Sequence, residues 1–501
     1  MKVKRFLNGM MAFTALIAAS MMSSCGHEPT PVNPPVNPDD TTTVVVDYGD
    51  LADILFENET QIGDGGAEFE FKGKATLPKG TYTLKGWIYI CDGAELTIPA
   101  GTVIKGDDRA ALIVEPGGKL HATGTASQPI VFTSAKAKGN RKPGDWGGVI
   151  ICGRAQNNQT TMQIEGGPRT THGGNDNADN SGELQYVRIE FAGYPFAKDK
   201  EINGLTMGSV GSGTKIDHVQ VSYCNDDSFE WFGGAVNCDH LVAFHGWDDE
   251  FDTDNGFSGK VQFCLGIRDP KIADTSKSNG FESDNDAEGD AKTPFTTAQF
   301  SNCTFVGPMI QDANFSNTAD YINGGAYNPN NGSALGIFQA SMHLRRNTRL
   351  SCANTLTIGW PVGIIIDNQR GDARSNYLNG NATLKNIVIA DCGIECSDFN
   401  GIFQDNLVSE YSTPTIDNTQ VSWTSTWFKS DASRRFATSS ELNLTSAFGF
   451  NFAFVPASNS SLLNVTLPAG FNGSNYVGAF AGTSDNWLSG WTEFDPNNQD
   501  Y

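Results

Sequence analysis

Short apolar runs separated by glycine-rich turns recur along most of the chain. Their common form is an apolar residue, two residues of any kind, a second apolar residue, one further residue and a third apolar residue. It occurs at Leu184/Val187/Ile189, Ile216/Val219/Val221, Phe300/Cys303/Phe305 and Leu384/Ile387/Ile389. This alternation is typical of short strands entered through a bend, whereas helices would show a 3.6-residue period. Since one such unit cannot bury its apolar face alone, the pattern predicts stacked coils.

One repeat can be aligned residue by residue. A shift of 22 residues places Ile216 on Cys238, Val219 on Leu241, Val221 on Ala243, Asp226-Asp227 on Asp248-Asp249 and Phe229 on Phe251. Twenty-two residues is about one turn of a three-sided coil with short strands and bends. The sequence therefore predicts an all-β fold, a right-handed parallel β-helix.

The N-terminal part of this region carries further strand-and-corner strings. They are Leu96-Thr97-Ile98-Pro99-Ala100-Gly101-Thr102, Gly117-Gly118-Lys119-Leu120-His121-Ala122-Thr123-Gly124-Thr125 and Pro129-Ile130-Val131-Phe132-Thr133-Ser134. These strings resemble the opening coils of right-handed β-helix surface proteins with a pectin-lyase-like fold, although Ala100 stands where glycine is usual. The tail, with Tyr476-Val477-Gly478-Ala479-Phe480 and Gly490-Trp491-Thr492, resembles the closing segment of Bacteroidota outer-membrane β-helix lipoproteins. The resemblance implies a fold and export, but no activity.

The N-terminus has the pattern of a lipoprotein leader. Basic residues begin the chain, and the apolar run Met10–Met22 is too short to span a bilayer comfortably. Small residues then precede Cys25, as in a bacterial lipobox, where that cysteine is acylated. A proline-rich spacer follows. We therefore expect an outer-membrane lipid anchor, at the cell surface or the periplasmic face, as the sole membrane attachment.

These patterns predict four regions. They are a signal peptide at 1–24, a linker at 25–47, the β-helix at 48–410 and a β-rich C-terminal capping region at 411–501. Open strand edges at the two ends of a stack would invite pairing with other chains. We therefore expect residues 48–72 to cap the start of the stack and the C-terminal region to cover its end.

The net charge of the chain limits the classes of partner that it is expected to bind. The formal net charge is −23, so the protein repels phosphate backbones and nucleic acid is not an expected partner. Ten cysteines leave nine after lipidation, an odd number that cannot all pair. Several occupy apolar repeat positions, which predicts buried thiols.

Three related strings carry the candidate chemistry. They begin at Phe229, Phe251 and Phe281, and an insertion around 268–277 lengthens the last coil to 30 residues. Because alternate strand residues face opposite sides, the three phenylalanines are expected inside the stack. The carboxylates are expected outside, on one face and within reach of a shared cation. These candidate metal ligands are Glu230, Asp252, Asp254, Glu282 and Asp284.

A column of carboxylates on parallel coils is costly unless something offsets its charge. At a spacing of about 4.8 Å, two neighbours repel by about 1 kcal/mol in water and by about 3.5 kcal/mol at an effective dielectric constant of 20. No lysine or arginine occurs within the three strings, so bound Ca²⁺ is one interpretation. Raised pKa values suited to acid–base catalysis are a second, and a solvated acidic face is a third.

Other side chains near the strings suggest two classes of function. A binding lipoprotein would present the β-helix to a glycan or a surface protein, with Trp231, Trp247 and Trp360 offering flat faces to sugar rings and His245 bordering a groove. A polysaccharide lyase or hydrolase would combine Glu230 and Asp252 with Lys277 or Arg268. No complete catalytic set can be named, which favours the binding protein. His218 and His240 stand one coil apart, and two ligands are too few for a transition metal, which favours a polar stack.

Overall fold

A computed structural model describes residues 47–197, 200–323, 325, 327, 336–398, 405–406, 415–416, 422–467 and 474–501. The chain divides into two units, Met1–Tyr48 and Gly49–Tyr501, and the architecture below is that of the second. The predicted signal peptide, Cys25 and nearly all of the linker lie outside the described residues.

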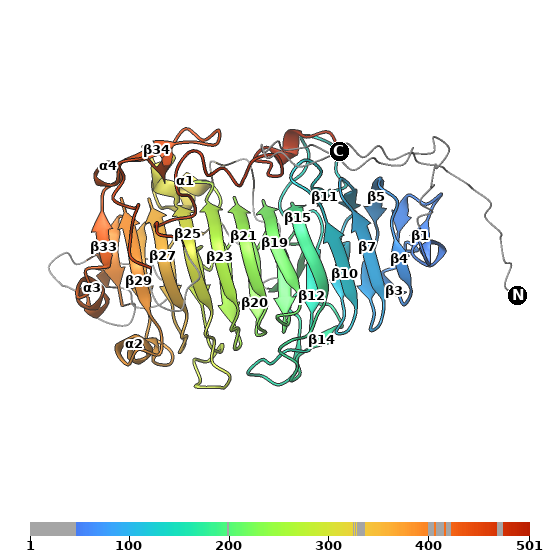
Figure 1. Ribbon diagram of the computed structural model, residues 1–501, viewed down its shortest axis with the longest axis horizontal. Coiled ribbons are helices and arrows are strands. Elements are labelled where there is room, and N and C mark those ends of the chain that lie inside the picture. The colour runs from blue at the N-terminus through green and yellow to red at the C-terminus, as the bar shows by residue number, and fades with distance from the viewer. Residues whose placement is uncertain are drawn as a thin grey trace, which may run out of the picture. The chain divides into compact units, whose positions relative to one another are not determined.

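Two long parallel sheets form the body of this unit (Figure 1). The first sheet contains β1 (Leu55–Phe56), β2 (Gln61–Ile62), β4 (Lys74–Thr76), β5 (Thr81–Leu84), β7 (Glu95–Pro99), β8 (Val103–Gly106), β10 (Lys119–Thr123), β11 (Ile130–Ser134), β15 (Gly182–Glu190), β19 (Lys215–Ser222), β21 (Asn237–Phe244), β23 (Lys260–Ile267), β25 (Gln299–Val306), β27 (Ser351–Ile358), β29 (Leu384–Ala390) and β33 (Arg434–Ala437). The second contains β3 (Glu68–Phe71), β6 (Trp87–Ile90), β9 (Ala111–Val114), β12 (Gly148–Cys152), β18 (Leu205–Gly208), β20 (Phe229–Phe232), β22 (Phe251–Asp254), β24 (Phe281–Ser283), β26 (Ala340–Leu344), β28 (Val362–Ile366) and β30 (Ile394–Ser397). From β18 to β30 the chain alternates between the two sheets, which confirms the predicted parallel β-helix.

The first sheet bends sharply, so each coil has three faces. In the early coils β10 and β11 are separate strands, and both pair with the single long strand β15. The bend in the long strands falls at one residue per coil, which adopts a left-handed backbone conformation. We call these residues the corner column; they are Tyr186, His218, His240, Phe263, Asn302, Asn354 and Asn386. The two halves of the first sheet and the whole second sheet make up the three faces.

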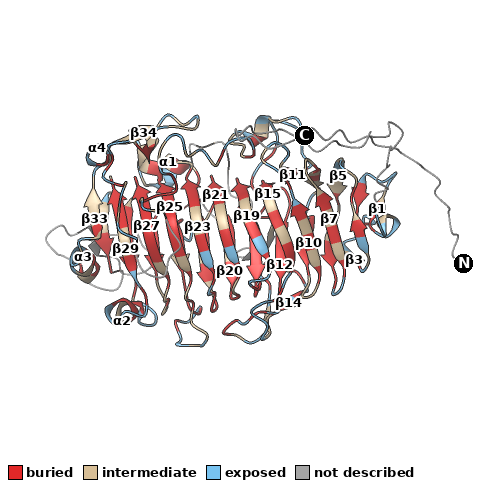
Figure 2. Cartoon of the chain, viewed as in Figure 1, coloured by how far each residue is buried: buried red, intermediate tan, exposed pale blue. Residues whose placement is uncertain are grey.

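The interior of the coils confirms the predicted register. Ile216 pairs with Cys238 across β19 and β21, as the 22-residue shift requires. Phe229, Phe251 and Phe281 stand opposite one another on β20, β22 and β24, and each is fully buried. The centroids of the Phe229 and Phe251 rings are 5.3 Å apart, and their planes differ by 5°. Figure 2 shows buried residues along nearly all of these strands.

Both ends of the stack are covered. At the start, β1 and β2 form an antiparallel hairpin whose second strand pairs with β5, and Ile54 is buried in the core. At the end, helix α3 (Trp423–Lys429) buries Phe428 against the last coils, and β33 pairs with β29. Short helices α1 (Ala319–Ile322) and α2 (Ala373–Leu378) lie in loops between coils.

The last part of the chain covers the side of the stack as well as its end. After α4 (Ser439–Leu442), β34 (Leu444–Ser446) pairs with β35 (Ala453–Pro456), and aromatic residues of this segment pack against the outer side chains of β21, β23, β27 and β29. The chain then returns to the early coils, where Lys105 Nζ donates to the carbonyl of Tyr501 at 2.6 Å. The capping region is therefore also a strap along one face.

Besides β34 with β35, three small antiparallel pairs of described strands lie outside the main sheets. They are β13 (Met162–Gln163) with β14 (Thr171–His172), β16 (Pro195–Ala197) with β17 (Lys200–Glu201), and β31 (Asp405–Asn406) with β32 (Thr415–Ile416). Among the described residues all nine cysteines are free thiols, and eight of them are buried, as their apolar positions predicted. No described helix has the length and apolarity that crossing a bilayer requires.

Candidate functional site

The outward row of carboxylates predicted from the repeat lies on the second sheet. Glu230 on β20 stands opposite Asp252 on β22, which stands opposite Glu282 on β24. The turns before β20 and β22 add two pairs of acidic residues. We call the resulting group the carboxylate cluster; it consists of Asp226, Asp227, Glu230, Asp248, Asp249 and Asp252.

Two overlapping triplets within this cluster have the spacing of metal ligands. One oxygen from each of Asp227, Glu230 and Asp252 lies within 4.8 Å of the other two. The same holds for Asp226, Asp227 and Asp248, so Asp227 belongs to both triplets. Six to eight oxygen ligands in an irregular arrangement are what Ca²⁺ accepts.

Burial and mutual repulsion make the ionised form of the cluster unfavourable in the folded chain. Burial, followed by repulsion from Glu230 and Glu282, raises the pKa of Asp252 well above its ordinary value. Burial and the neighbouring carboxylates likewise raise the pKa values of Asp227, Glu230, Asp248 and Asp249. The folded chain therefore favours protons or another positive charge at this place.

Asp252 gives a specific indication of what the cluster lacks. Its Oδ1 atom is buried and has no hydrogen-bond partner within the described part of the chain. A buried, unpaired carboxylate oxygen costs free energy unless a proton or a cation satisfies it. Asn203 donates to Glu230, and the backbone N–H of Asp249 donates to Asp227 Oδ1 at 2.8 Å, so the flanking carboxylates are held in place. The donor set and its unsatisfied oxygen fit a hard divalent cation.

The far end of the row has a different source of positive charge. Arg345, just after β26, forms ion pairs with Glu282 and with Asp284, the latter at 2.9 Å, and Arg346 pairs with Asp284 at 2.8 Å. Burial would raise the pKa of Glu282, but Arg345 and His343 lower it to about 2. The prediction that all five carboxylates share one external cation is therefore wrong, because Arg345 and Arg346 already pair with Glu282 and Asp284. Burial still leaves the pKa of Asp284 above its ordinary value.

Asp254 lies between these two ends of the row. Burial and the charge of Asp284 raise its pKa to about 7. Both of its oxygens accept hydrogen bonds from Asn255, at 2.8 Å from the side-chain amide. It is absent from the triplets with metal-ligand spacing among the described residues. The candidate ligands from the original five are thus reduced to Glu230 and Asp252.

Arg268 is held by internal contacts, although its charge acts to lower the pKa values of Asp248 and Asp249. Its side chain is fully buried, 3.3 Å from the equally buried Glu250, and it donates to the carbonyls of Trp247, Asp248 and Ile272. These bonds tie the turn that carries Asp248 to the inserted loop. The prediction of Arg268 as a catalytic residue is wrong, because every one of these contacts is internal.

Lys277 lies beside the cluster, on the inserted loop that packs against it. Ser276 Oγ donates to Asp248 Oδ2, and the backbone N–H of Asn279 donates to Asp249 Oδ1. Lys277 itself has a left-handed backbone, with φ of 86°, and its side chain is largely buried. Strained backbone at a non-glycine residue occurs preferentially at functional sites. Lys277 therefore lies between two residues, Ser276 and Asn279, whose hydrogen bonds reach the cluster.

The aromatic residues predicted to bind sugar rings are inside the protein. Trp231 and Trp247 are fully buried and Trp360 is 1% exposed. Trp231 stacks on Phe257 with ring centroids 5.3 Å apart. Its assignment as a ligand-binding residue is therefore wrong, and so are those of Trp247 and Trp360. His245 is half-buried and contacts the hydroxyl of Tyr223 at 3.1 Å rather than the cluster.

A surface pocket adjoins the C-terminal end of β20. Its lining includes Phe232, which closes β20, and Glu165 from the loop between β13 and β14. Glu165 is close enough to contribute to the raised pKa of Glu230. The loop between β13 and β14 therefore lies near Glu230, which sequence repeats could not reveal because this loop is not part of a repeat.

Comparison with known proteins gives a family but no close relative. A profile of the pectate-lyase like beta helix domain matches residues 70–432. No curated protein sequence matches the chain. Among solved structures, pectate lyase Pel9A is 11% identical, with coverage of 78% of this chain and 88% of its own and a TM-score of 0.32. The Dettilon tailspike protein is 12% identical, with coverage of 66% and 62% and a TM-score of 0.23.

Proposed function

The chain belongs to the pectate-lyase-like β-helix family, and from that premise and the site's geometry we propose that it binds an acidic polysaccharide through Ca²⁺ and cleaves it as a lyase. The observation that carries the proposal is the position of Lys277 on a loop hydrogen-bonded to Asp248 and Asp249 of the carboxylate cluster. Elimination from a uronic acid requires a cation that binds the sugar carboxylate and a base beside it.

Ca²⁺ is the cation that suits the cluster best. Asp226, Asp227, Glu230, Asp248 and Asp252 would hold it, since they form the two triplets with metal-ligand spacing. Carboxylate oxygens are hard ligands, and Ca²⁺ tolerates an irregular arrangement of them. When bound, the ion would neutralise the cluster and attract the carboxylate of a uronic acid. Without it, an acidic polysaccharide would be repelled.

Lys277 is the proposed general base. In an elimination the base takes the proton from the carbon next to the sugar carboxylate, the electron pair forms a carbon–carbon double bond, and the glycosidic oxygen leaves and is protonated. A lysine serves this purpose only when it is uncharged, and nearby positive charge and burial both lower a lysine pKa. The side chain of Lys277 is largely buried, and its neighbours Ser276 and Asn279 are hydrogen-bonded to the cluster.

A binding protein without catalysis is the second candidate. The low exposure of Lys277, 6%, favours it because a base must reach the substrate. In that case the cluster would still hold Ca²⁺ and the polysaccharide, while cleavage would be absent. Direct stacking of sugar rings on tryptophan is no longer part of this candidate, since the three tryptophans are buried.

One experiment separates the two candidates. The full chain is incubated with uronic-acid polysaccharides, with Ca²⁺ or a chelator, and the ultraviolet absorbance of the unsaturated product is followed while binding is measured by affinity electrophoresis. The lyase proposal expects Ca²⁺-dependent product, lost in Lys277→Met with binding retained. Arg370→Gln, at an exposed surface pair, is the matched control. Binding without product in the wild type would support the binding protein, and neither binding nor product would exclude both.

We also propose export and lipid anchoring through Cys25. The support is the basic, apolar and small-residue pattern before that cysteine and the proline-rich spacer after it. An anchored β-helix at the outer membrane would meet extracellular or periplasmic polysaccharide, which fits the proposed substrate.

A further inference from the structure

A second group of metal-ligating side chains lies away from the carboxylate cluster, on the corner column. His218 and His240 occupy neighbouring positions of that column, on β19 and β21. Their rings stack with centroids 4.2 Å apart and planes within 17°. Tyr186 continues the stack on one side, at 4.4 Å, and Phe263 on the other, at 5.0 Å. The stack fixes both imidazoles in one orientation.

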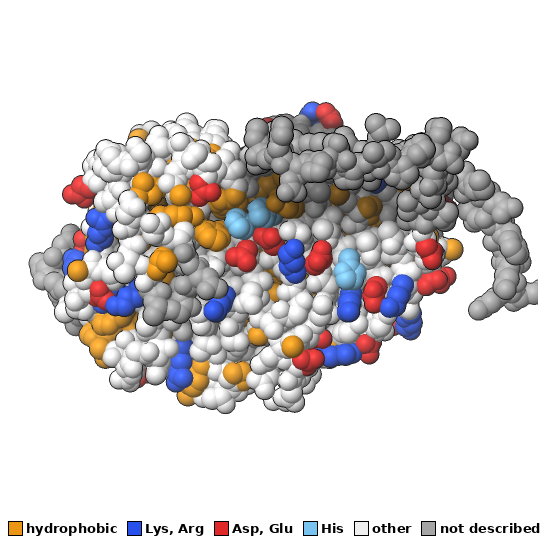
Figure 3. Space-filling view, viewed as in Figure 1, with side chains coloured by type: hydrophobic (Ala, Val, Ile, Leu, Met, Phe, Trp, Pro, Cys, Tyr) orange, Lys and Arg blue, Asp and Glu red, His pale blue; other side chains and the backbone are white. Residues whose placement is uncertain are grey.

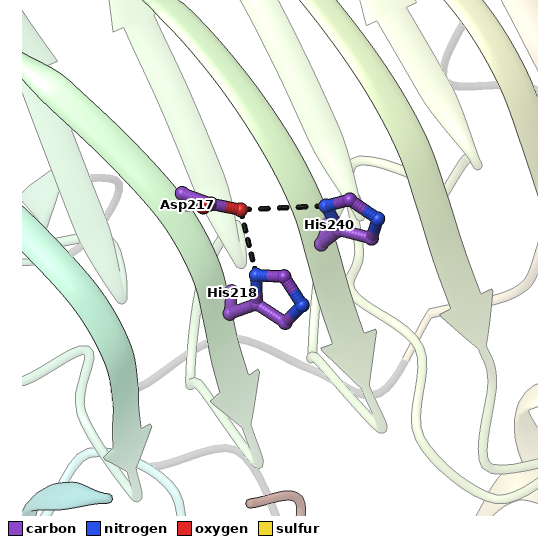
Figure 4. Close-up of side chains that lie close together, drawn as sticks. All are labelled: Asp217, His218 and His240. Carbon is purple, nitrogen blue, oxygen red and sulfur yellow. Dashed lines mark hydrogen bonds and ion pairs between the residues drawn. The ribbon is translucent and has the colours of Figure 1, made fainter. Parts of the chain in front are cut away.

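Asp217 lies against the same edge of both rings. Its Oδ1 is 2.6 Å from Nδ1 of His218 and 3.3 Å from Nδ1 of His240 (Figure 4). One ligand atom from each of the three residues lies within 4.8 Å of the other two. The other ring nitrogen of each histidine points away from Asp217. The left-handed bend at His218 produces this convergence, because ordinary alternation would turn adjacent residues to opposite sides.

Neighbouring side chains hold the three groups in place. Gln185 Nε2 donates to Asp217 Oδ2 at 3.1 Å, which leaves Oδ1 turned towards the rings. Trp491 meets the His218 ring edge to face at 5.4 Å, and Trp487 meets the His240 ring at 5.1 Å. Outer partners of this kind orient ligands in metal sites. The side chains of Asp217, His218 and His240 remain 22%, 13% and 26% exposed, so an ion has access.

We propose that Asp217, His218 and His240 bind a divalent transition metal such as Zn²⁺, with water in the fourth position. Imidazole suits Zn²⁺ and its neighbours in the transition series, whereas Ca²⁺ takes oxygen ligands. The ion would replace the hydrogen-bonding protons between Asp217 Oδ1 and the two Nδ1 atoms. Metal–ligand bonds of about 2.0–2.2 Å require His218 to move back from the carboxylate and the two near-parallel rings to turn so that both Nδ1 lone pairs point at the ion.

This site is distinct from the carboxylate cluster. The corner column separates the two halves of the first sheet, while the cluster lies on the second sheet. Histidine side chains lie beside acidic ones and next to hydrophobic ones on the face shown in Figure 3. Failure of the proposed lyase function would leave the metal site standing, and the reverse also holds. Without a metal, the same residues would be an aromatic stack that continues the column.

Zinc titration of the full chain, purified without a histidine tag and saturated with Ca²⁺, tests the proposal. Isothermal titration of the wild type is expected to show one Zn²⁺ site that His218→Gln and His240→Gln each weaken at least tenfold. His245→Gln is the matched control, since it removes a half-buried histidine at another bend, and its affinity is expected to be unchanged. Zinc affinity that is absent in the wild type, or equal in all four proteins, overturns the proposal.

A second measurement does not depend on the variants folding. Crystals of the wild type soaked in ZnCl₂ are expected to give an anomalous difference peak between Asp217, His218 and His240. Absence of a peak there, with zinc bound elsewhere or not at all, contradicts the site. Circular dichroism melting of each glutamine variant shows whether any lost affinity comes from unfolding instead.

Discussion

Glu230 and Asp252 face each other on adjacent coils, at the same outward position of β20 and β22, and Asp227 brings a third carboxylate within 4.8 Å of both. Arg345 pairs with the next carboxylate along the row, Glu282. This contrast divides one acidic row into an end that pairs with arginines and an end whose raised pKa values favour protons or another positive charge.

The aromatic core under the row makes a large contribution to stability. Phe251 is fully buried and stacks on Phe229, so Phe251→Ala leaves a cavity that is expected to cost about 3–5 kcal/mol of unfolding free energy. Urea unfolding measures this cost. Leu378→Ala, at a side chain that is 57% exposed, is the control and is expected to change stability by less than about 0.5 kcal/mol. Equal effects of the two substitutions would contradict the buried column.

The arginine end is expected to depend on Arg345. Arg345→Gln leaves Glu282 and Asp284 short of a partner in a largely buried place, and removal of one member of such a pair costs about 3–5 kcal/mol. The pKa of Glu282 is expected to rise from about 2, which NMR titration would follow. Arg370→Gln breaks an exposed pair with Glu288 and is expected to cost less than about 1 kcal/mol. An unshifted Glu282 would show that Arg345 does not hold it ionised.

Stability without divalent cations is expected to fall as the pH rises. Burial and Asp284 raise the pKa of Asp254 from 3.8 to about 7, so the folded state holds its proton more tightly than the unfolded state does. The favourable contribution is complete below pH about 4 and is lost as the pH rises towards about 7. The raised pKa values in the carboxylate cluster act in the same direction.

Calorimetry in a chelator at several pH values between about 5 and 8 measures this dependence. The melting temperature is expected to decrease across the range, and to decrease less in Asp254→Asn. A melting temperature that rises with pH would contradict the raised pKa values. The pairing of Glu282 does not disturb the test, because its lowered pKa affects stability only at more acidic pH.

Membrane attachment is expected to depend on Cys25. Cys25→Ala removes the acylated thiol, so the protein should move from the outer-membrane fraction to the soluble fraction on cell fractionation. Cys392→Ala, at a partly buried thiol within the β-helix, is the control and is expected to stay with the membrane. Retention of Cys25→Ala in the outer membrane would refute the lipobox interpretation.

The sequence predicted the coil register well, because the side-chain period of a strand and the 22-residue repeat are both visible in the residues. Strand alternation also places Trp231 inside, because it lies two residues after the buried Phe229. The prediction that its ring is exposed and binds sugars was therefore inconsistent with the strand pattern. The role of Arg345 could not be found in this way. It follows Glu282 by 63 residues, across a coil enlarged by a long loop, so no repeat aligns the two.

The position of Asp217 shows a second limit of sequence patterns. Strand alternation assigns Asp217 and His218 to opposite sides, and only the left-handed bend at His218 turns both towards His240. Two histidines in register were visible in the sequence, but the third ligand was not recognised as one. At the corners of a β-helix, the backbone conformation must therefore be known before one can say which side chains lie together.

Thermal unfolding in Ca²⁺ and in chelator measures most directly whether Ca²⁺ binds at Glu230 and Asp252. A cation that binds only the folded state adds about 2.7 kcal/mol at 100 times its dissociation constant. The wild type is expected to melt at a higher temperature in Ca²⁺ than in chelator, and Glu230→Gln with Asp252→Asn is expected to lose that difference. Identical melting of the wild type in the two conditions would contradict the calcium site.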